Sequence, residues 1–373
     1  MKKMILALSA MSLLLAGCHG AVDPNEEDNK VDNKVDISEL KGSITLSTDR
    51  KVIGADGKYE AKLTVILMDS HGEEYDVTSD VEIFIEGQDT PMADPVFKTN
   101  VEGDYVFYAV RGFDISNSVS VQAVKGVPAL PADPDAANTS FAHRMLLVQH
   151  TGNECPNCPG LMDILKRIGD DENYASRYHH VASHSYNSTD DAFSLAAQTL
   201  SKNMDVHNYP MLTYNLTSAS GYFEDEVKES IMSLSKDVAQ VGICASSTVE
   251  DDKIIANVAI KSAVDSKYRI AVWVLEDNIH SPQSGATASW HNMHSNCLRL
   301  MYGQGKIEGI YGRSVGLVEA GATKDMVVAI DWDPEWIIQN CELMIIVTDA
   351  DDVVELANCT YCPAQGSVSY NYL

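Results

Sequence analysis

The 373-residue sequence has few basic residues: 27 Lys and Arg stand against 54 Asp and Glu, which gives a formal net charge of −27. An acidic surface repels the phosphates of nucleic acids, so no nucleic-acid partner is expected. The simplest role of the excess acids is solubility. Beyond the first residues the sequence also lacks a long apolar run, so no further segment is expected to cross a bilayer.

The motifs of several enzyme classes are missing as well. The sequence has no Gly-x-Gly-x-x-Gly, no phosphate-binding loop and no serine elbow of the hydrolase type. Nucleotide chemistry and acyl transfer therefore have no support, and no cofactor is expected.

The amino terminus indicates where the protein works. Lys2 and Lys3 precede an apolar stretch at 4–14, and Leu15-Ala16-Gly17-Cys18 follows. A short apolar region that ends in small residues before a cysteine is typical of a bacterial lipoprotein signal, which is removed as residues 1–17. The mature chain is then held at a membrane by acyl groups on Cys18. An ordinary secretory signal with an incidental cysteine is the alternative.

Residues 18–36 are polar and acidic without apolar periodicity, which predicts a flexible tether. An acidic stretch soon after the lipidated cysteine resembles the surface-export signal of bacteroidete lipoproteins. The resemblance implies a protein that faces either the periplasm or the cell surface.

Residues 37–127 predict an antiparallel β-sandwich, because alternating segments are separated by turn signals. The Asp56-Gly57 turn before Leu63-Thr64-Val65 resembles bacterial immunoglobulin-like domains, which implies a spacer or adhesion module. The proline-rich segment 128–140 that follows predicts a semi-rigid linker.

Residues 141–238 alternate between strands and helices. Strands are expected at 145–149, 178–185 and 210–214, and helices at 155–170, 190–203 and 223–236. Such an order predicts a small sheet covered by helices.

Cys155-Pro156-Asn157-Cys158 lies at the junction between the first of these strands and the first helix. Unpaired N–H groups at a helix start favour a thiolate, so Cys155 is the candidate nucleophile and Cys158 the resolving thiol. The alternative is a closed disulfide that staples the start of the helix.

The run from Thr151-Gly152 through Cys158-Pro159 resembles the thioredoxin superfamily, and more closely the lipoproteins related to the twenty-eight-kilodalton outer membrane protein. The resemblance implies a thioredoxin-like domain in an outer-membrane lipoprotein with a supposed adhesive role. It further implies a cis-proline at Pro210 and a docking edge for a protein or peptide ligand at the backbone of Tyr209. Two positions depart from the superfamily: Gln149 replaces a buried aspartate, and Glu154 places an anion beside Cys155.

Residues 239–373 predict a second β-sandwich, with a long connection at 278–318 expected to form surface loops. This region contains five more cysteines: Cys244, Cys297, Cys341, Cys359 and Cys362. The second Cys-x-x-Cys, at 359–362, lacks a helical continuation and is interpreted as structural. If Cys18 is lipidated, seven thiols are left and at least one stays unpaired.

Three groups of residues leave a metal site open as an alternative. The two Cys-x-x-Cys pairs offer four thiolates for zinc, and the histidine pairs His180/His184 and His291/His294 offer imidazoles. The acidic run 349–352 suggests calcium but lacks the spacing of an EF-hand loop, so a hairpin turn explains it. Satisfied or solvated side chains are the favoured interpretation, and no metal is expected.

The sequence as a whole predicts a multidomain α+β protein: a sandwich, a thioredoxin-like α/β unit and a C-terminal sandwich. Its predicted function is that of a lipid-anchored binding or adhesion lipoprotein. The alternative is an extracytoplasmic thiol-disulfide oxidoreductase that uses Cys155 and Cys158, with Pro210 shaping the docking site.

Overall fold

The computed structural model describes residues 37–373, except 218–220, 304 and 351–354. The predicted signal 1–17, the tether 18–36 and the lipidation residue Cys18 therefore lie outside the described residues. A short 3-10 helix, η1 (Ile37–Glu39), is described in the first unit of the chain, and residues 41–373 form the second.

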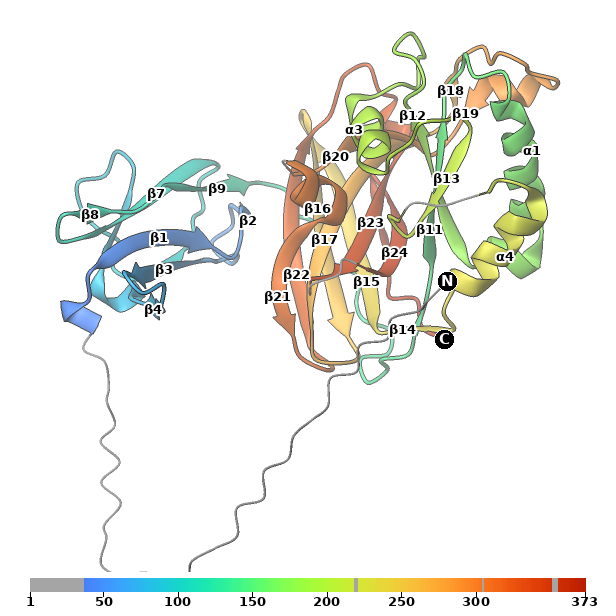
Figure 1. Ribbon diagram of the computed structural model, residues 1–373. Coiled ribbons are helices and arrows are strands. Elements are labelled where there is room, and N and C mark those ends of the chain that lie inside the picture. Colours follow the sequence, from blue (N-terminus) through green and yellow to red (C-terminus); the bar gives the residue numbers. More distant parts are fainter. Residues whose placement is uncertain (1–36, 218–220, 304, 351–354) are drawn as a thin grey trace, which may run out of the picture. The chain divides into compact units, whose positions relative to one another are not determined.

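Two small sheets form the first part of this second unit (Figure 1). One contains β1 (Gly42–Thr48), β3 (Ala61–Asp69), β4 (Glu74–Asp76) and β6 (Val96–Phe97). The other contains β2 (Val52–Gly54), β5 (Glu82–Ile85), β7 (Gly103–Arg111), β8 (Asp114–Ile115) and β9 (Val119–Val124).

Alternation along the strands explains why these two sheets pack face to face. In β3, Leu63, Val65 and Leu67 are fully buried, while the residues between them are partly or fully exposed. The ring of Phe97 from the first sheet meets the edge of Phe107 from the second, with centroids 4.9 Å apart. The β-sandwich content expected for this region is confirmed, and its immunoglobulin-like identity stays a prediction.

An eight-stranded mixed sheet dominates the remaining described residues (Figure 1). Its strands run in the order β13-β11-β12-β20-β17-β23-β24, and β21 also pairs with β17. The strands are β11 (Met145–Thr151), β12 (Tyr178–His184), β13 (Met211–Tyr214), β17 (Ser266–Glu276), β20 (Cys297–Met301), β21 (Arg313–Val318), β23 (Cys341–Asp349) and β24 (Leu356–Pro363). β12 lies parallel to β11 and to β20, and the other pairs are antiparallel.

This sheet shows that the predicted fold class is wrong. A thioredoxin-like α/β unit followed by a separate sandwich was expected, but β11, β12 and β13 continue through β20 into the strands of the C-terminal region. The described chain is mostly β, and no separate α/β unit stands out in it. The physical reason is β20, which joins the two halves: Ala182 N donates to Asn296 O at 2.8 Å, and Ala182 pairs with Cys297. The sequence predicts surface loops for this segment, which lies within the connection 278–318.

Helices cover both faces at one end of the large sheet. The helices of this region are α1 (Cys158–Gly169), α2 (Glu172–Ala175), α3 (Leu195–Asn203) and α4 (Glu224–Leu234). Met145 and Leu147 of β11 pack against α1 and α4, whereas Leu146 and Val148 pack with Leu200 of α3 on the opposite face. β11 therefore lies between two helical layers, as Figure 1 shows.

A four-stranded antiparallel sheet covers the other end, on the face that carries α1. Its strands are β15 (Val241–Glu250), β16 (Lys253–Ser262), β22 (Thr323–Asp331) and β25 (Gly366–Val368). Ile243 and Val258 of this sheet pack against Ile270, Val272 and Ile345 of the large one. This packing is the C-terminal sandwich that the sequence predicts, but it is built on the same sheet as β11 and β12.

Local sequence explains where the helices begin. Pro159 fits the first turn of α1, which starts at Cys158 rather than at Cys155 as predicted. Leu161, Leu165 and Ile168 are buried at helical spacing, and each contributes roughly 1.5–3 kcal/mol by leaving water. α3 starts at Leu195 because the Ser194 hydroxyl accepts from Ala197 N at 3.0 Å, five residues later than predicted.

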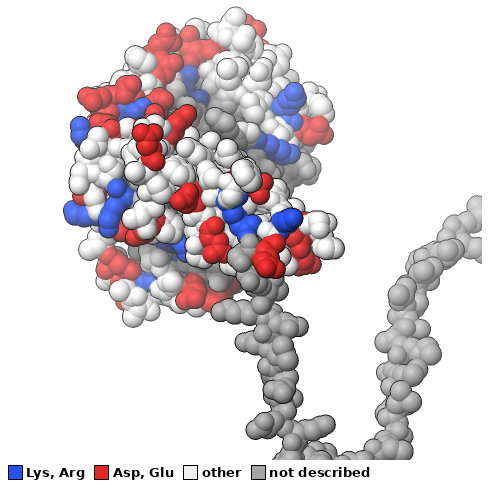
Figure 2. Space-filling model, turned by 90° about the vertical axis from the view of Figure 1, so that its left-hand side faces the viewer, with Lys and Arg blue, Asp and Glu red and all other residues white. Residues whose placement is uncertain are grey.

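Acidic and basic side chains are interspersed on the face shown in Figure 2. No helix among the described residues is long and apolar enough to cross a membrane. The expectation that nucleic acid is not a partner stays a prediction.

We expect Glu342→Gln to stabilise the protein more at pH 8 than at pH 5. Burial, with the nearby charge of Asp277, raises the pKa of Glu342 to about 7. The folded state therefore holds a proton that the unfolded chain releases above about pH 4.5, so stability is lost as pH rises through 7. The difference between the two pH values should be about 1–2 kcal/mol in urea unfolding, after allowance for partial exposure.

The exposed residue Glu335 provides the control for this prediction. Glu335→Gln should change stability equally at both pH values. If Glu342→Gln behaves like this control, the carboxyl of Glu342 does not titrate with a raised pKa.

Candidate functional site

The cysteines of the first Cys-x-x-Cys lie between the end of β11 and the start of α1, where the sequence predicts them. Cys155 and Cys158 form a disulfide with their Cα atoms 5.4 Å apart. Cys155 N donates to Gly152 O, and Cys158 N donates to Cys155 O, so residues 152–158 form a tight turn that leads into the helix and is called the dithiol turn below. Cys155 is only 1% exposed and Cys158 is 0% exposed, although Pro156 and Asn157 between them are exposed.

A segment more than a hundred residues away packs against the turn that holds this disulfide. Residues 281–286, called the capping loop below, contact the backbone of the motif. The side-chain nitrogen of Gln283 donates to the carbonyls of Gly152, Asn153 and Cys155 at 3.3, 3.1 and 3.0 Å. Gln283 is 6% exposed, and the two hydrogens of its buried amide nitrogen are shared among these carbonyls, which also accept from backbone N–H groups.

Three further contacts hold the capping loop in place. Ser284 N donates to Asn153 O at 2.6 Å, and Asn153 Nδ2 donates to Ser281 Oγ at 2.9 Å. Gly285 has a φ of +74°, and a Cβ there would lie 2.3 Å from Pro156 O. Only glycine fits this close approach, because a side chain would collide with the backbone of the motif.

Asp190 fixes the other side of the dithiol turn. One of its carboxylate oxygens accepts from Asn153 N at 2.8 Å and lies 2.7 Å from His184 Nδ1, and the other accepts from Ala192 N at 3.0 Å. Burial alone would raise the pKa of Asp190, but the interaction with His184 and the two backbone N–H groups lower it well below its usual range. A charged, hydrogen-bonded carboxylate therefore anchors the turn from inside.

The Tyr209–Pro210 peptide bond is cis, as the sequence predicts. β13 begins at Met211, which pairs with His150 of the antiparallel strand β11. Pro210 directly precedes Met211, so the register places it at the end of β11, next to the dithiol turn. Pro210 is buried and Tyr209 is half-buried. The role of Tyr209 as a docking edge stays a prediction.

Aromatic side chains surround this edge. Tyr209 and Tyr186 make an edge-to-face contact with centroids 5.1 Å apart, and Tyr186 is 46% exposed. A Cβ on Gly152 would lie 2.5 Å from the Cβ of Tyr186, so glycine in the Thr-Gly pair permits this packing. The hydroxyl of Tyr209 lies 3.0 Å from that of Ser185, which fixes the ring.

The two departures from the superfamily pattern have structural explanations. Gln149 is buried, and its oxygen lies 3.2 Å from His180 Nε2, so an amide rather than a carboxylate stands behind the turn. Glu154 is exposed and accepts from the Thr189 hydroxyl at 3.1 Å. Its charge is directed to the surface and is screened by water.

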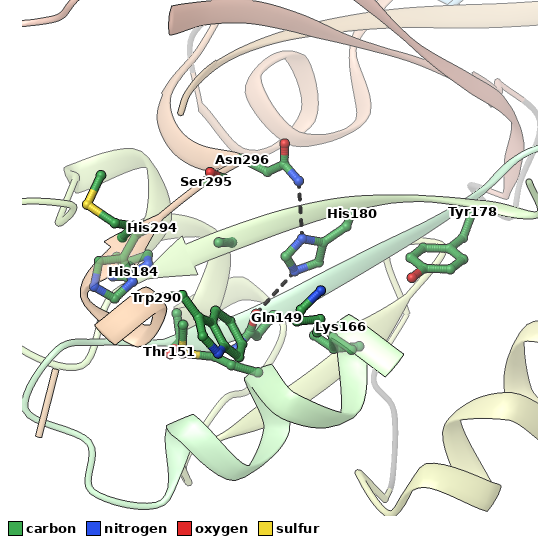
Figure 3. A pocket seen from close by; sticks show the side chains of 14 residues that line it. Gln149, Thr151, Lys166, Tyr178, His180, His184, Trp290, His294, Ser295 and Asn296 are labelled. Atoms are coloured by element: carbon green, nitrogen blue, oxygen red, sulfur yellow. Dashed lines mark hydrogen bonds between the residues drawn. The ribbon is translucent and has the colours of Figure 1, made fainter. Parts of the chain in front are cut away.

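A cavity of about 360 Å³ lies beside the dithiol turn, between α1 and the same face of β11 and β12. Strands β11 and β12, helix α1 and the segment 290–296 supply its lining side chains, which Figure 3 draws as sticks. The lining residues are Gln149, Thr151, Met162, Leu165, Lys166, Tyr178, His180, Ala182, His184, Trp290, Met293, His294, Ser295 and Asn296. Ligands commonly bind at the carboxyl ends of parallel strands, and this cavity occupies that position on β11 and β12.

Two polar groups of the lining have no partner among the described residues. They are the side-chain nitrogen of Gln149 and the hydroxyl of Thr151, which belong to residues only 4% and 3% exposed. Asn296 Nδ2 lies 3.3 Å from His180 Nδ1, so His180 accepts there and donates through Nε2 to Gln149 (Figure 3). Burial, with the nearby charge of His184, lowers the pKa of His180 to about 4, which keeps this ring neutral.

Replacement of Thr151 by valine should stabilise the protein by about 1–2 kcal/mol in urea unfolding. The buried hydroxyl of Thr151 makes no hydrogen bond, and valine has the same shape and favours a strand. Thr213→Val is the matched control, because the Thr213 hydroxyl lies 3.0 Å from buried His150 Nε2 and its loss should destabilise by about 1–3 kcal/mol. Equal effects of the two changes would contradict the assignment of an unpartnered hydroxyl.

The other five cysteines among the described residues are buried thiols. Cys359 and Cys362 alternate on β24 and belong to cores on opposite faces of the sheet, so they cannot bind one metal ion together. Burial raises the pKa of Cys362 to about 12. Their position inside the cores supports the structural interpretation of the second Cys-x-x-Cys.

The histidine pairs separate into structural and cavity-lining residues. His180 and His184 lie on one face of β12, as predicted, and line the cavity together with His294. His291 is buried and satisfied: its Nδ1 accepts from Thr287 N and Ala288 N, and its Nε2 donates to Asp163 at 3.0 Å. Among the described residues no group of three or more His, Cys, Asp and Glu is arranged to hold a metal ion. The acidic run 349–352 lies partly outside the described residues.

Sequence reasoning missed the capping loop and Asp190. Gln283 carries no pattern in the sequence that links it to the dithiol, since its role depends on a contact between distant segments. Asp190 had a weak signal, because it begins the segment predicted as a helix, and it caps a turn there instead: Phe193 N donates to Asp190 O at 2.9 Å.

Comparison with known proteins finds similarity among solved structures only. No family model matches the chain, and no curated protein matches it. HBP35 of Porphyromonas gingivalis is similar with a TM-score of 0.51 and 14% identity, covering 61% of this chain and 76% of that one. A domain of the outer membrane lipoprotein Omp28 of the same organism has a TM-score of 0.23 and 20% identity, covering 36% of this chain and 90% of that one. The similarity to HBP35 concerns the fold alone, and the second score carries no argument.

Proposed function

We propose that this chain is a lipid-anchored envelope protein with a binding or adhesion role, in which the Cys155–Cys158 disulfide is structural. The observation that carries the structural role of the disulfide is the burial of both cysteines in a turn whose backbone the capping loop contacts. A catalytic dithiol needs an accessible sulfur for attack on a substrate disulfide, and Cys155 is only 1% exposed. The disulfide instead ties the end of β11 to the start of α1.

The signal pattern at 1–18 supports anchoring through Cys18, and the location that we propose is the outer membrane, facing the periplasm or the cell surface. Cells that express the chain should incorporate labelled fatty acid into it, and Cys18→Ala should abolish the label. Ser12→Ala, which leaves the cysteine in place, should not. If Cys18→Ala still incorporates the labelled fatty acid, Cys18 is not the lipidated residue and the proposed anchor is wrong.

The exposed aromatic edge near Pro210 is the surface best suited to a protein or peptide ligand. Tyr186 is 46% exposed and packs against Tyr209, and aromatic residues supply much of the binding energy at protein interfaces. Backbone pairing beside Tyr209 would add specificity, as a strand added to a sheet edge does.

A redox titration of the purified full-length chain tests the structural role of the disulfide. We expect the disulfide to resist reduction down to a potential below about −300 mV, and the thiols to react with a maleimide only when the protein unfolds. Cys155→Ser is the control for the assignment of the labelled sulfurs.

The alternative function, a thiol-disulfide oxidoreductase, is favoured by one observation: cis-Pro210 directly precedes β13, at the end of β11 that leads into the dithiol turn. The Cys155 thiolate would attack a substrate disulfide and release one substrate thiolate. Cys158 would then displace the second thiolate and close the Cys155–Cys158 disulfide. A potential well above about −300 mV with alkylation of the folded protein would establish this alternative in place of the structural role.

A further inference from the structure

The cavity beside the dithiol turn has the features of a binding site that neither the anchor nor the disulfide explains. Its lining combines apolar side chains from α1, at Met162 and Leu165, with the aromatic rings of Trp290 and Tyr178. Its volume of about 360 Å³ lies within the range of small-molecule sites.

The polar groups of the cavity are arranged to donate hydrogen bonds. Gln149 uses its oxygen on His180, which leaves both hydrogens of its amide nitrogen unused, and the Thr151 hydroxyl is also free to donate. Buried donors without a partner cost free energy, and a ligand that accepts hydrogen bonds would satisfy them. A ligand that matches these unpaired donors therefore carries a hydrogen-bond acceptor.

The charge of the lining indicates which acceptor. In a chain with twice as many acids as bases, the residues that line this cavity include Lys166 and no Asp or Glu. Lys166 lines the same cavity as Gln149 and His180, and Figure 3 labels all three. Lys166 also forms an ion pair with Asp170 at 2.9 Å, but the two side chains are 54% and 68% exposed, so water weakens this pair and leaves Lys166 at the mouth of the cavity able to exchange it for a ligand. A negatively charged acceptor is thus favoured over a neutral one.

We propose that this cavity binds a small amphipathic carboxylate. The carboxylate accepts from Gln149 and Thr151 and pairs with Lys166, and an aromatic or branched apolar body lies against Trp290, Met162 and Leu165. This inference goes beyond the proposed function, because it needs neither the lipid on Cys18 nor any reaction of the disulfide.

Calorimetric titration of the purified full-length chain tests the proposal, with phenylacetate, indoleacetate and isovalerate as probes and their amides as neutral controls. At least one acid should bind about tenfold more tightly than its amide. Lys166→Met and Thr151→Val should each weaken that acid about fivefold or more. Lys202→Met, at an exposed lysine of α3 outside the cavity, should leave the affinity unchanged.

Gln149→Glu gives a second, charge-based readout. The new carboxylate still accepts from His180 Nε2, but it places a negative charge where the ligand carboxylate would lie, so binding of the acid should be lost. The proposal is overturned if none of the acids binds at up to about 10 mM, if acids and amides bind equally, or if Lys202→Met weakens binding as much as Lys166→Met. Thr151→Val keeps the test decisive should Gln149→Glu fail to fold, because that variant is expected to be stable.

Discussion

Replacement of Gln283 by leucine should lower the free energy of unfolding by about 2–4 kcal/mol and make Cys155 reactive after mild reduction. Leucine fills nearly the same space but donates nothing. The carbonyls of Gly152, Asn153 and Cys155 then lose a donor inside the protein, and the capping loop loses the group that holds it over the disulfide.

Two measurements on the same samples check this prediction. Urea unfolding followed by tryptophan fluorescence gives the stability, and the rate of maleimide labelling at a fixed low concentration of reductant gives the access to the sulfurs. Gln198→Leu is the control, because Gln198 is exposed on α3, which packs on the face of β11 opposite α1. It should leave both measurements close to those of the unchanged protein.

The two measurements show whether the capping loop controls access to the disulfide or only stabilises the fold. Lower stability together with faster labelling means that the capping loop controls access to the disulfide. Lower stability with unchanged labelling would contradict the cap, since it would mean that other groups seal the sulfurs. Gly285→Ala offers an independent disturbance, because its Cβ would collide with Pro156 and push the capping loop away from the motif.

The local parts of this site could be predicted from the sequence. Cysteine spacing, a following helix and a distant Tyr-Pro pair give the dithiol turn, α1 and the cis bond at Pro210, because each depends on residues near one another in the chain or on a strong motif. The common face of His180 and His184 follows from strand alternation in the same way.

The rest could not be predicted, because it depends on which distant segments pair. Alternation shows that a segment forms a strand, but it does not show which sheet that strand joins. β20 illustrates the problem: five residues inside a long connection link β12 to β17 and turn two expected domains into one sheet. Gln283 likewise gains its role only when the connection folds back over Cys155.

Replacement of Arg299 by methionine should cost about 3–5 kcal/mol, the largest stability effect expected from a single charge in this region. Arg299 Nε donates to Glu276 Oε2 at 2.7 Å, and Glu276 is only 3% exposed. The other carboxylate oxygen of Glu276 accepts from Ile337 N at 2.8 Å. Without the guanidinium, a buried carboxylate is left with a single backbone donor, and this penalty exceeds the value of the ion pair itself.

The same arginine also connects the pair to the candidate site. Its Nη1 donates to the carbonyls of Asp191 and Phe193 at 3.0 and 3.4 Å, directly after Asp190, which anchors the dithiol turn. Loss of Arg299 should therefore loosen the segment that leads into α3 and raise the labelling of the disulfide after mild reduction, although the substituted residue lies on β20.

Urea unfolding of a double-mutant cycle separates these contributions. Glu276→Leu combined with Arg299→Met should recover most of the lost stability, because no uncompensated charge remains buried. Arg167→Met is the matched control: Arg167 pairs with Glu224 at 2.8 Å but is 56% exposed, so its loss should cost no more than about 1 kcal/mol. An Arg299→Met variant that loses no more stability than Arg167→Met would contradict this prediction. It would mean that the Glu276 carboxylate takes up water or a proton in the variant, and that the ion pair does not hold β20 to the segment before α3.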